Sequence, residues 1–377
     1  MNNELVAIRQ ALSGARSAKD VFGVLQGTVQ EQEKQAKRLY RMIAKKTHPD
    51  YYLGAEKEEA NEMFQLLTSW WQIAQLEIKD CSYGKGDDKF TYSKATTDEI
   101  KTKKNSYRVV KLYRSGDLSD VYHGEYANEL GKRQEVAIKI AVDKNDNEFI
   151  KTEAKNLRLL KSVAKGRYEM FARYLPTMIE TFTVNGDDGV MLQGNVLKFY
   201  KEFYTLAEVI SAYPNGVDPR NMAWMWNRIL EVIGFAHRNE LIHGAVIPDH
   251  ILVHPVFHSA KLIDWCTALE SGRVKLMSVA NEAYYAPEIP AKKNVTTATD
   301  IFMSAQCMIR LLGAKNIEAL KSDIPQPIKR ILKSCVVPAI SKRPDDAWEL
   351  RDEFEQVLEK LYGKRSYCEF KMPGPRK

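Results

Sequence analysis

Apolar residues recur at helical spacing through the first 80 residues of the chain. Two stretches, 31–46 and 55–78, place them three or four positions apart. These apolar positions include Leu39, Ile43, Met63, Leu67 and Trp71. Because residues spaced in this way share one face of a helix, each stretch predicts an amphipathic helix. With short helices expected within 1–18 and near 20–25, the pattern predicts a helical module built on a hairpin.

From about residue 107 onward the pattern mixes two periods. Residues 134–140 alternate apolar and polar positions, which is typical of a half-buried strand. Residues 148–160 and 221–238 return to helical spacing. The apolar face of the longer stretch comprises Met225, Ile229, Val232, Ile233 and Ala236. Strands followed by a larger helical part predict an α+β fold.

A polar stretch separates these two patterns. Residues 81–106 are rich in Gly, Asp and Lys, which predicts a linker. We therefore expect a helical module at 1–80, a linker at 81–106, a larger domain at 107–363 and a basic, fraying tail at 364–377. The chain of 377 residues is 44% hydrophobic and 28% charged, as is usual for a soluble globular protein.

Charge and cysteine usage narrow the classes of function. The net charge of +7 is modest, and no zinc finger or aromatic–basic motif accompanies it, so no specific nucleic-acid partner is expected. The sequence has no long apolar span and no leader peptide, so neither a membrane nor secretion is expected. Five scattered cysteines without metal-ligand spacing indicate reduced thiols and a cytoplasmic protein.

The candidate chemistry centres on residues 241–252. Protein kinases carry His-Arg-Asp in their catalytic loop, followed at fixed spacing by a Lys and an Asn. The stretch resembles that loop with its reactive groups replaced. The residues at the five positions are His243, Gly244, Ala245, Ile247 and His250. An Ala side chain cannot accept a proton and an Ile cannot neutralise a phosphate, so we expect no catalytic residue here.

Residues that match other sequence motifs of the kinase family occur in the family's order. Lys139 resembles the strand lysine that holds the α- and β-phosphates, Glu153 its ion-pair partner on the next helix, and Asp264 the Mg²⁺ ligand. Three further residues match structural positions of the family: Glu288 in an Ala-Pro-Glu triplet, Asp300 and Arg343. The resemblance covers about 107–363 and implies a bilobal, protein-kinase-like fold with impaired catalysis.

The loop that covers the phosphates in kinases is eroded. Its three glycine positions and the charges around them are Arg114, Gly116, Asp117, Ser119 and Asp120, ahead of Val121. Negative charges near the phosphates would weaken binding, whereas the retained Lys139, Glu153 and Asp264 favour it. Two alternatives follow: a site that binds ATP and Mg²⁺, with Asp264 and His250 as metal ligands, or a site that has lost both. In the second alternative His250 packs within its loop.

A second resemblance lies in the helical module. His48-Pro49-Asp50 stands between the two longer predicted helices, as in a J-domain of the DnaJ type. Pro49 ends the first helix and turns the chain, which exposes the tripeptide. The preceding helix carries a basic face formed by Lys37, Arg38, Arg41, Lys45 and Lys46. In that family such residues engage an acidic surface of a DnaK-type ATPase and trigger its ATP hydrolysis.

The two resemblances together predict a co-chaperone adaptor. The elements that usually follow a J-domain in DnaJ, a Gly/Phe-rich tract, a zinc module and a client-binding barrel, have no counterpart in the sequence. The kinase-like part is therefore expected to bind an unidentified client protein. One alternative is an enzyme, an atypical protein kinase or nucleotidyl transferase that uses Asp264 and His250. A second alternative is a scaffold with neither activity.

Overall fold

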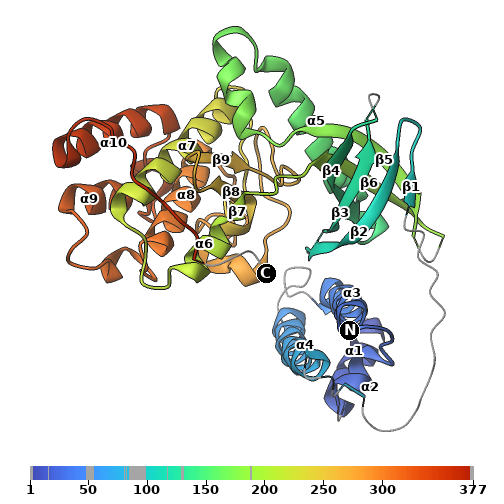
Figure 1. The fold of residues 1–377 in the computed structure, drawn as a ribbon. Coiled ribbons are helices and arrows are strands. Elements are labelled where there is room, and N and C mark those ends of the chain that lie inside the picture. Colours follow the sequence, from blue (N-terminus) through green and yellow to red (C-terminus); the bar gives the residue numbers. More distant parts are fainter. Residues whose placement is uncertain are drawn as a thin grey trace. The chain divides into compact units, whose positions relative to one another are not determined.

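The chain divides into two compact units, residues 1–98 and 99–377 (Figure 1). A computed structural model describes residues 3–15, 17–47, 55–79, 81, 83–84, 99–116, 118–128, 131–186 and 189–373. The two units are described separately. Strands are confined to the larger unit, within the described residues, and its mixture of helix and sheet gives the chain an α+β fold.

The smaller unit is a bundle of helices. Its described elements are α1 (Asn3–Gly14), α2 (Ala18–Phe22), α3 (Val29–Thr47) and α4 (Ala55–Lys79). Ser17 caps α2 in a reciprocal pair with Asp20, which satisfies two backbone donors at the helix start. The predicted hairpin is present, because α3 packs along α4 and buries the apolar seam between them.

Aromatic packing holds this bundle together. The Trp71 ring lies 5.4 Å from Tyr40 and 6.1 Å from Phe22, so one side chain of α4 joins α2 and α3. The predicted helix before the hairpin also packs on α4, where the Trp70 indole donates to the Leu12 carbonyl at 3.3 Å. The residues of the smaller unit therefore share one core.

The larger unit begins with a six-stranded antiparallel sheet. Its strands are β1 (Glu99–Lys101), β2 (Ser106–Ser115), β3 (Ser119–Ala127), β4 (Arg133–Ala141), β5 (Met178–Asn185) and β6 (Met191–Lys198). They pair in the order β1-β2-β3-β4-β6-β5. The short 3₁₀ turn η2 (Lys144–Asp146) leads into α5 (Asn147–Val163), which packs against β4, β5 and β6. The last part of the predicted linker, residues 99–106, was assigned wrongly, because it forms β1 and opens β2.

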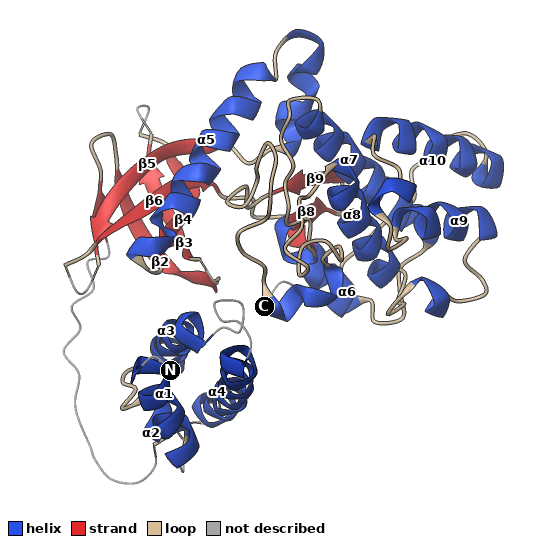
Figure 2. Cartoon of the chain, turned by 180° about the vertical axis from the view of Figure 1, so that it is seen from behind, coloured by secondary structure: helices blue, strands red, loops and turns tan. Residues whose placement is uncertain are grey.

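A mainly helical lobe follows, as Figure 2 shows. Its helices are α6 (Leu206–Ala212), α7 (Pro219–His237), α8 (Thr297–Leu311), α9 (Gln326–Cys335) and α10 (Ala347–Tyr362). A small sheet in the order β7-β8-β9 combines β7 (Tyr204–Thr205), β8 (Ile251–His254) and β9 (Ser259–Leu262). The remaining elements are the 3₁₀ segments η3 (Gly166–Tyr174), η4 (Pro248–His250), η5 (Val279–Tyr284), η6 (Ile317–Ala319) and η7 (Ile340–Lys342).

The core of this lobe surrounds α7. All but a few of its residues are buried, including the predicted apolar face and both tryptophans. Trp226 donates to the Ser304 hydroxyl on α8 at 3.1 Å. A helix buried on nearly every side gives the neighbouring loops a rigid support.

The C-terminal segment departs from the prediction of a fraying tail. Phe370 is buried in the core of the helical lobe, and Tyr367 stacks on His258 at 4.4 Å between ring centroids. The apolar side chains explain the difference, since burying them offsets the entropy lost on ordering the segment. Residues 374–377 lie outside the described part of the chain. None of the helices in the described ranges is both long and apolar enough to span a bilayer.

Candidate functional site

The site is built around Lys139, a buried cation on β4. Its Nζ donates to Glu153 Oε1 at 3.1 Å, lies 3.1 Å from Asp264 Oδ2 and donates to Cys266 Sγ at 3.2 Å. The structure thus brings together Lys139, Glu153 and Asp264, three of the five residues that the sequence predicts for a nucleotide site, the others being Gly116 and Val121. The contact with Cys266 could not be found from sequence spacing, because 127 positions separate the two residues.

The sheet and α5 hold Glu153 in place. Asn195 on β6 stands directly opposite Lys139 in the register of β4 and β6. Its side-chain amide donates to Glu153 Oε2 at 3.0 Å and to the Ile150 carbonyl at 2.9 Å. Each Glu153 oxygen therefore has its own partner, as a buried carboxylate requires.

The charges of this cluster support one another. Burial by itself would lower the pKa of Lys139, but Asp264 and Glu153 together raise it well above its ordinary value. Burial would raise the pKa of Asp264, but the Lys139 ammonium brings it below its ordinary range. Burial raises the pKa of the Cys266 thiol. At neutral pH Lys139 is therefore an ammonium, Asp264 a carboxylate and Cys266 a neutral thiol.

The degenerate loop keeps its architecture without a base. Ala245 is 2% exposed, and its carbonyl accepts from His250 Nδ1 at 2.9 Å. The opposite ring nitrogen, Nε2, lies 3.6 Å from Asp264 Oδ2. His250 therefore packs within the loop and also faces the candidate metal position. This one geometry is compatible with both alternatives for His250, metal ligand and packing residue. Ile247 is buried and offers no charge.

His243 is a structural residue in a dry environment. Its Nε2 donates to the Ile263 carbonyl at 3.1 Å, and its Nδ1 accepts from the Ala245 amide at 3.3 Å. These two bonds fit the neutral ring, with the proton on Nε2. Burial lowers the pKa of His243 to about 4. The ring therefore stays uncharged at neutral pH.

The backbone of the loop takes an unusual conformation at one position. Gly244, at the position of the family's Arg, has φ +72°, in the left-handed region that favours glycine. A Cβ there would lie 2.8 Å from Val274 Cγ2. An arginine at this position would need both a strained backbone and a displaced neighbour.

The three predicted structural residues form buried contacts, and one of them anchors the loop. The buried Asp300 accepts from the His243 amide at 2.7 Å and from the Gly244 amide at 2.8 Å. Arg343 contacts Glu288 through two parallel bonds of 2.8 and 3.0 Å. A buried, bidentate pair of this kind fixes the geometry of the segments it joins.

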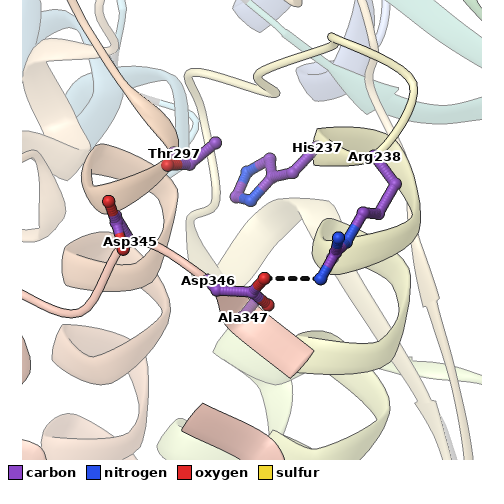
Figure 3. Close-up of a pocket in the computed structure, with 7 residues that line it drawn as sticks. His237, Arg238, Thr297, Asp345, Asp346 and Ala347 are labelled. Carbon is purple, nitrogen blue, oxygen red and sulfur yellow. Dashed lines mark hydrogen bonds and ion pairs between the residues drawn. The ribbon is translucent and has the colours of Figure 1, made fainter. Parts of the chain in front are cut away.

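A pocket of about 190 Å³ lies behind this loop (Figure 3). It is lined by Gly234, His237, Arg238, Thr297, Asp345, Asp346 and Ala347. Arg238 and Asp346 pair across it at 2.6 Å, while His237 Nε2 bonds to Asp300 at 2.9 Å. The pocket is thus linked to the loop through Asp300, but it holds none of the predicted site residues.

The eroded phosphate loop keeps a tight turn at Gly116, but Asp120 does not lie where the sequence predicts it. Gly116 closes a tight turn, since a Cβ there would lie 2.9 Å from the Ser119 carbonyl oxygen. Val121 pairs with Lys139 across β3 and β4, whereas Asp120 pairs with Ile140. Because neighbouring strand residues point to opposite faces, Asp120 faces away from Lys139. The prediction that its charge lies close to the phosphates is therefore wrong. Asp117 lies outside the described residues.

Arg114, at the first of the glycine positions, forms a contact that sequence reasoning missed. Its guanidinium lies 3.0 Å from Asp249 and 3.6 Å from Glu208, both in the helical lobe. The separation of 135 positions from Asp249 leaves no local signal of this pairing.

The predicted partner surface is only partly exposed. Arg38 and Lys46 are exposed on α3, and Lys37 and Lys45 are half-buried. Arg41 is buried, so the prediction that it belongs to an exposed basic face is wrong. His48, Pro49 and Asp50 lie outside the described residues.

The cluster fits a nucleotide and its metal in part. Lys139 is placed to neutralise phosphates, and Asp264 offers a carboxylate oxygen, the ligand that Mg²⁺ prefers. Glu153, Asp264 and Cys266 bring their ligand atoms within 4.8 Å of one another. The Lys139 ammonium already contacts all three. Asp264 would hold Mg²⁺, which would supply charge neutralisation to the phosphates, and Lys139 would contact a phosphate oxygen.

No protein-family model matches the chain. Among curated proteins, the serine/threonine-protein kinase PrkC of Bacillus subtilis (strain 168) is 23% identical over 280 residues. The alignment covers 68% of this chain and 40% of that kinase, so the chain spans less than half the length of its relative. This distant similarity suggests a protein-kinase-like domain over part of the chain.

Proposed function

We propose that this chain is a co-chaperone adaptor that joins a J-domain-like module to a catalytically impaired kinase-like domain. The kinase-like domain binds a client protein, and the helical module recruits a DnaK-type ATPase and stimulates it. The observation that carries the proposal is the buried methyl group of Ala245 where a kinase places its catalytic base. Removal of a positioned base typically lowers the rate of transfer about 10²–10⁴-fold.

The loss extends beyond the base. Ile247 brings no charge to the phosphates, and His250 spends one ring nitrogen on the Ala245 carbonyl. Gly244 takes a backbone conformation that an arginine would strain. Three independent departures within one loop favour recognition over phosphoryl transfer.

The helical module supports the co-chaperone half. The described helices α3 and α4 pack on each other, and in the sequence His48-Pro49-Asp50 stands between them. Arg38 and Lys46 on α3 are exposed. Exposed cations on this helix suit an acidic partner surface, and their attraction would speed association at low salt.

An ATPase measurement tests this half. The full chain is added to a DnaK-type ATPase, and steady-state hydrolysis is compared for the parent, His48→Gln and Lys19→Glu. The last variant changes one charge on α2, outside the α3 face, and serves as the matched control. We expect stimulation by the parent and the control and none by His48→Gln. Equal stimulation by all three would disprove the co-chaperone half.

A retained nucleotide site is part of the proposal, supported by the Lys139, Glu153 and Asp264 cluster. ATP with Mg²⁺ should therefore raise the midpoint of thermal unfolding, because a ligand that binds only the folded state stabilises it. Asp264→Ala should abolish the shift. If saturating ATP moves the parent no more than this variant, the domain acts without nucleotide.

The enzyme alternative has one observation in its favour. His250 Nε2 and Asp264 Oδ2 lie 3.6 Å apart, close enough to share a divalent ion after a small shift. Incubation with labelled ATP and Mg²⁺ or Mn²⁺ separates the two functions. Covalent label that disappears in both Asp264→Ala and His250→Ala would establish a transferase.

A further inference from the structure

Arg114 joins the sheet to the helical lobe at three points. The residue lies on β2, and its Nη1 donates to Asp249 Oδ1 at 3.0 Å. Its Nη2 donates to Thr205 Oγ1 at 3.3 Å and lies 3.6 Å from Glu208 Oε1. One guanidinium on the sheet therefore contacts both η4 and the start of α6.

The acceptors on the helical lobe are themselves fixed. Glu208 Oε2 accepts from the Thr205 amide at 2.6 Å and from its hydroxyl at 2.9 Å, in the capping box that begins α6. Its other oxygen, Oε1, faces Arg114. Asp249 Oδ2 accepts from the side-chain amide of Asn281 at 3.3 Å. Arg114 thus meets a preorganised pair of carboxylates.

Arg114 shares a face of the sheet with the candidate nucleotide site. It pairs with Val121, and Val121 pairs with Lys139, so the three residues form one row across β2, β3 and β4. Residues directly opposite one another on antiparallel strands point to the same face. At about 4.8 Å between strands, Arg114 is roughly 10 Å from Lys139, within the span of a polyphosphate.

We propose that Arg114 is an interlobe latch that holds the nucleotide site closed and must release Asp249 and Glu208 when a polyphosphate enters. The ligand in this inference rests on the nucleotide binding proposed above, whereas the latch itself does not. Arg114, Asp249 and Glu208 are 40%, 37% and 32% exposed, so water and salt reach the pair and keep it weak enough to open.

Hydrogen–deuterium exchange of residues 112–122 tests the latch without nucleotide. Arg114→Ala should speed exchange of these amides about fivefold, the change that coupling of about 1 kcal/mol produces at 25 °C. Asp249→Asn should speed it less, because Arg114 keeps its contacts with Thr205 and Glu208. The double variant should exchange no faster than Arg114→Ala, because without the guanidinium Asp249 has no contact of the latch left to lose. The matched control is Arg108→Ala, which removes a 2.8 Å ion pair to Glu125 within the same sheet. This control should leave the exchange of 112–122 unchanged.

Salt gives a second readout. Raising the salt from about 0.05 M to about 1 M should speed exchange in the parent but not in Arg114→Ala, because only the parent has the pair to screen. Exchange in Arg114→Ala that matches the Arg108→Ala control would overturn the latch. Additive effects of Arg114→Ala and Asp249→Asn would overturn it as well.

Calorimetric titration with ATP and Mg²⁺ then tests the link to the ligand. We expect Arg114→Ala to bind ATP about fivefold more tightly than the parent, because no contact has to break first. Weaker binding by Arg114→Ala would mean that Arg114 holds the phosphates, which contradicts a closing latch. If no variant binds ATP, the proposed nucleotide site fails, and the exchange result alone decides on the latch.

Discussion

Replacing Lys139 by Met should destabilise the larger unit by about 3 kcal/mol. The thioether preserves the length and apolar stem of the side chain but removes the ammonium that Glu153 and Asp264 share at 3.1 Å each. Breaking a buried pair by removing one partner costs about 3–5 kcal/mol, because the remaining charge is left without compensation. Glu153 is 2% exposed and keeps only its bond from Asn195. The 29% exposure of Asp264 places the expected value at the lower end of the range.

Guanidinium denaturation followed by tryptophan fluorescence measures this change. The matched control is Lys151→Met, which removes an exposed pair to Glu148 and should cost about 0.5 kcal/mol or less. The double variant Lys139→Met/Glu153→Gln should recover part of the loss, because it removes the carboxylate left without its cation. A cost for Lys139→Met no larger than that of Lys151→Met would refute the reasoning about a buried, shared ammonium.

Three further predictions concern protonation, thiols and chemistry. Burial lowers the pKa of His243 to about 4, so its contribution is complete above about pH 6.5 and is lost as the pH falls. From pH 7 to pH 5 the free energy of unfolding of the parent should fall about 2 kcal/mol more than that of His243→Gln, and equal losses would contradict this. Brief alkylation of the native chain, read by mass spectrometry, should label Cys81 and Cys368 but spare the buried Cys266, Cys307 and Cys335; early labelling of Cys266 would contradict its burial. Ala245→Asp alone should give no phosphoryl transfer from labelled ATP, because Ile247 and His250 remain, and rapid transfer would show that only the base was missing.

Periodicity predicted the elements well because apolar positions recur regularly along each of them. The strand at Arg133–Ala141 and the helices at Asn147–Val163 and Pro219–His237 begin and end within a few residues of the stretches that the sequence indicates. The ordered motifs also placed Lys139, Glu153 and Asp264 in one cluster. Local patterns sufficed there, because Lys139 and Glu153 lie on elements with a clear period and Asp264 closely follows the end of β9.

The misses are contacts that no local pattern carries. Arg114 meets Asp249 across 135 positions, and Lys139 meets Cys266 across 127. Asp120 was assigned to the phosphate side because proximity in sequence was read as proximity in space, although one step along a strand reverses the face. Arg41 was counted as a surface cation because the helical pattern alone does not tell which side of α3 the bundle covers. The burial of Phe370 was missed as well, because a single apolar residue in a polar segment forms no periodic pattern.

Gly244 makes the lost chemistry of the catalytic loop harder to restore than the replaced side chains alone suggest. A designer who wished to install phosphotransferase chemistry could exchange Ala245, Ile247 and His250 by simple substitution. An arginine beside them would meet a further cost, because the main chain has φ +72° there and a Cβ would lie 2.8 Å from Val274 Cγ2. Restoring the loop would thus require a strained backbone and a displaced Val274 side chain as well as new reactive groups.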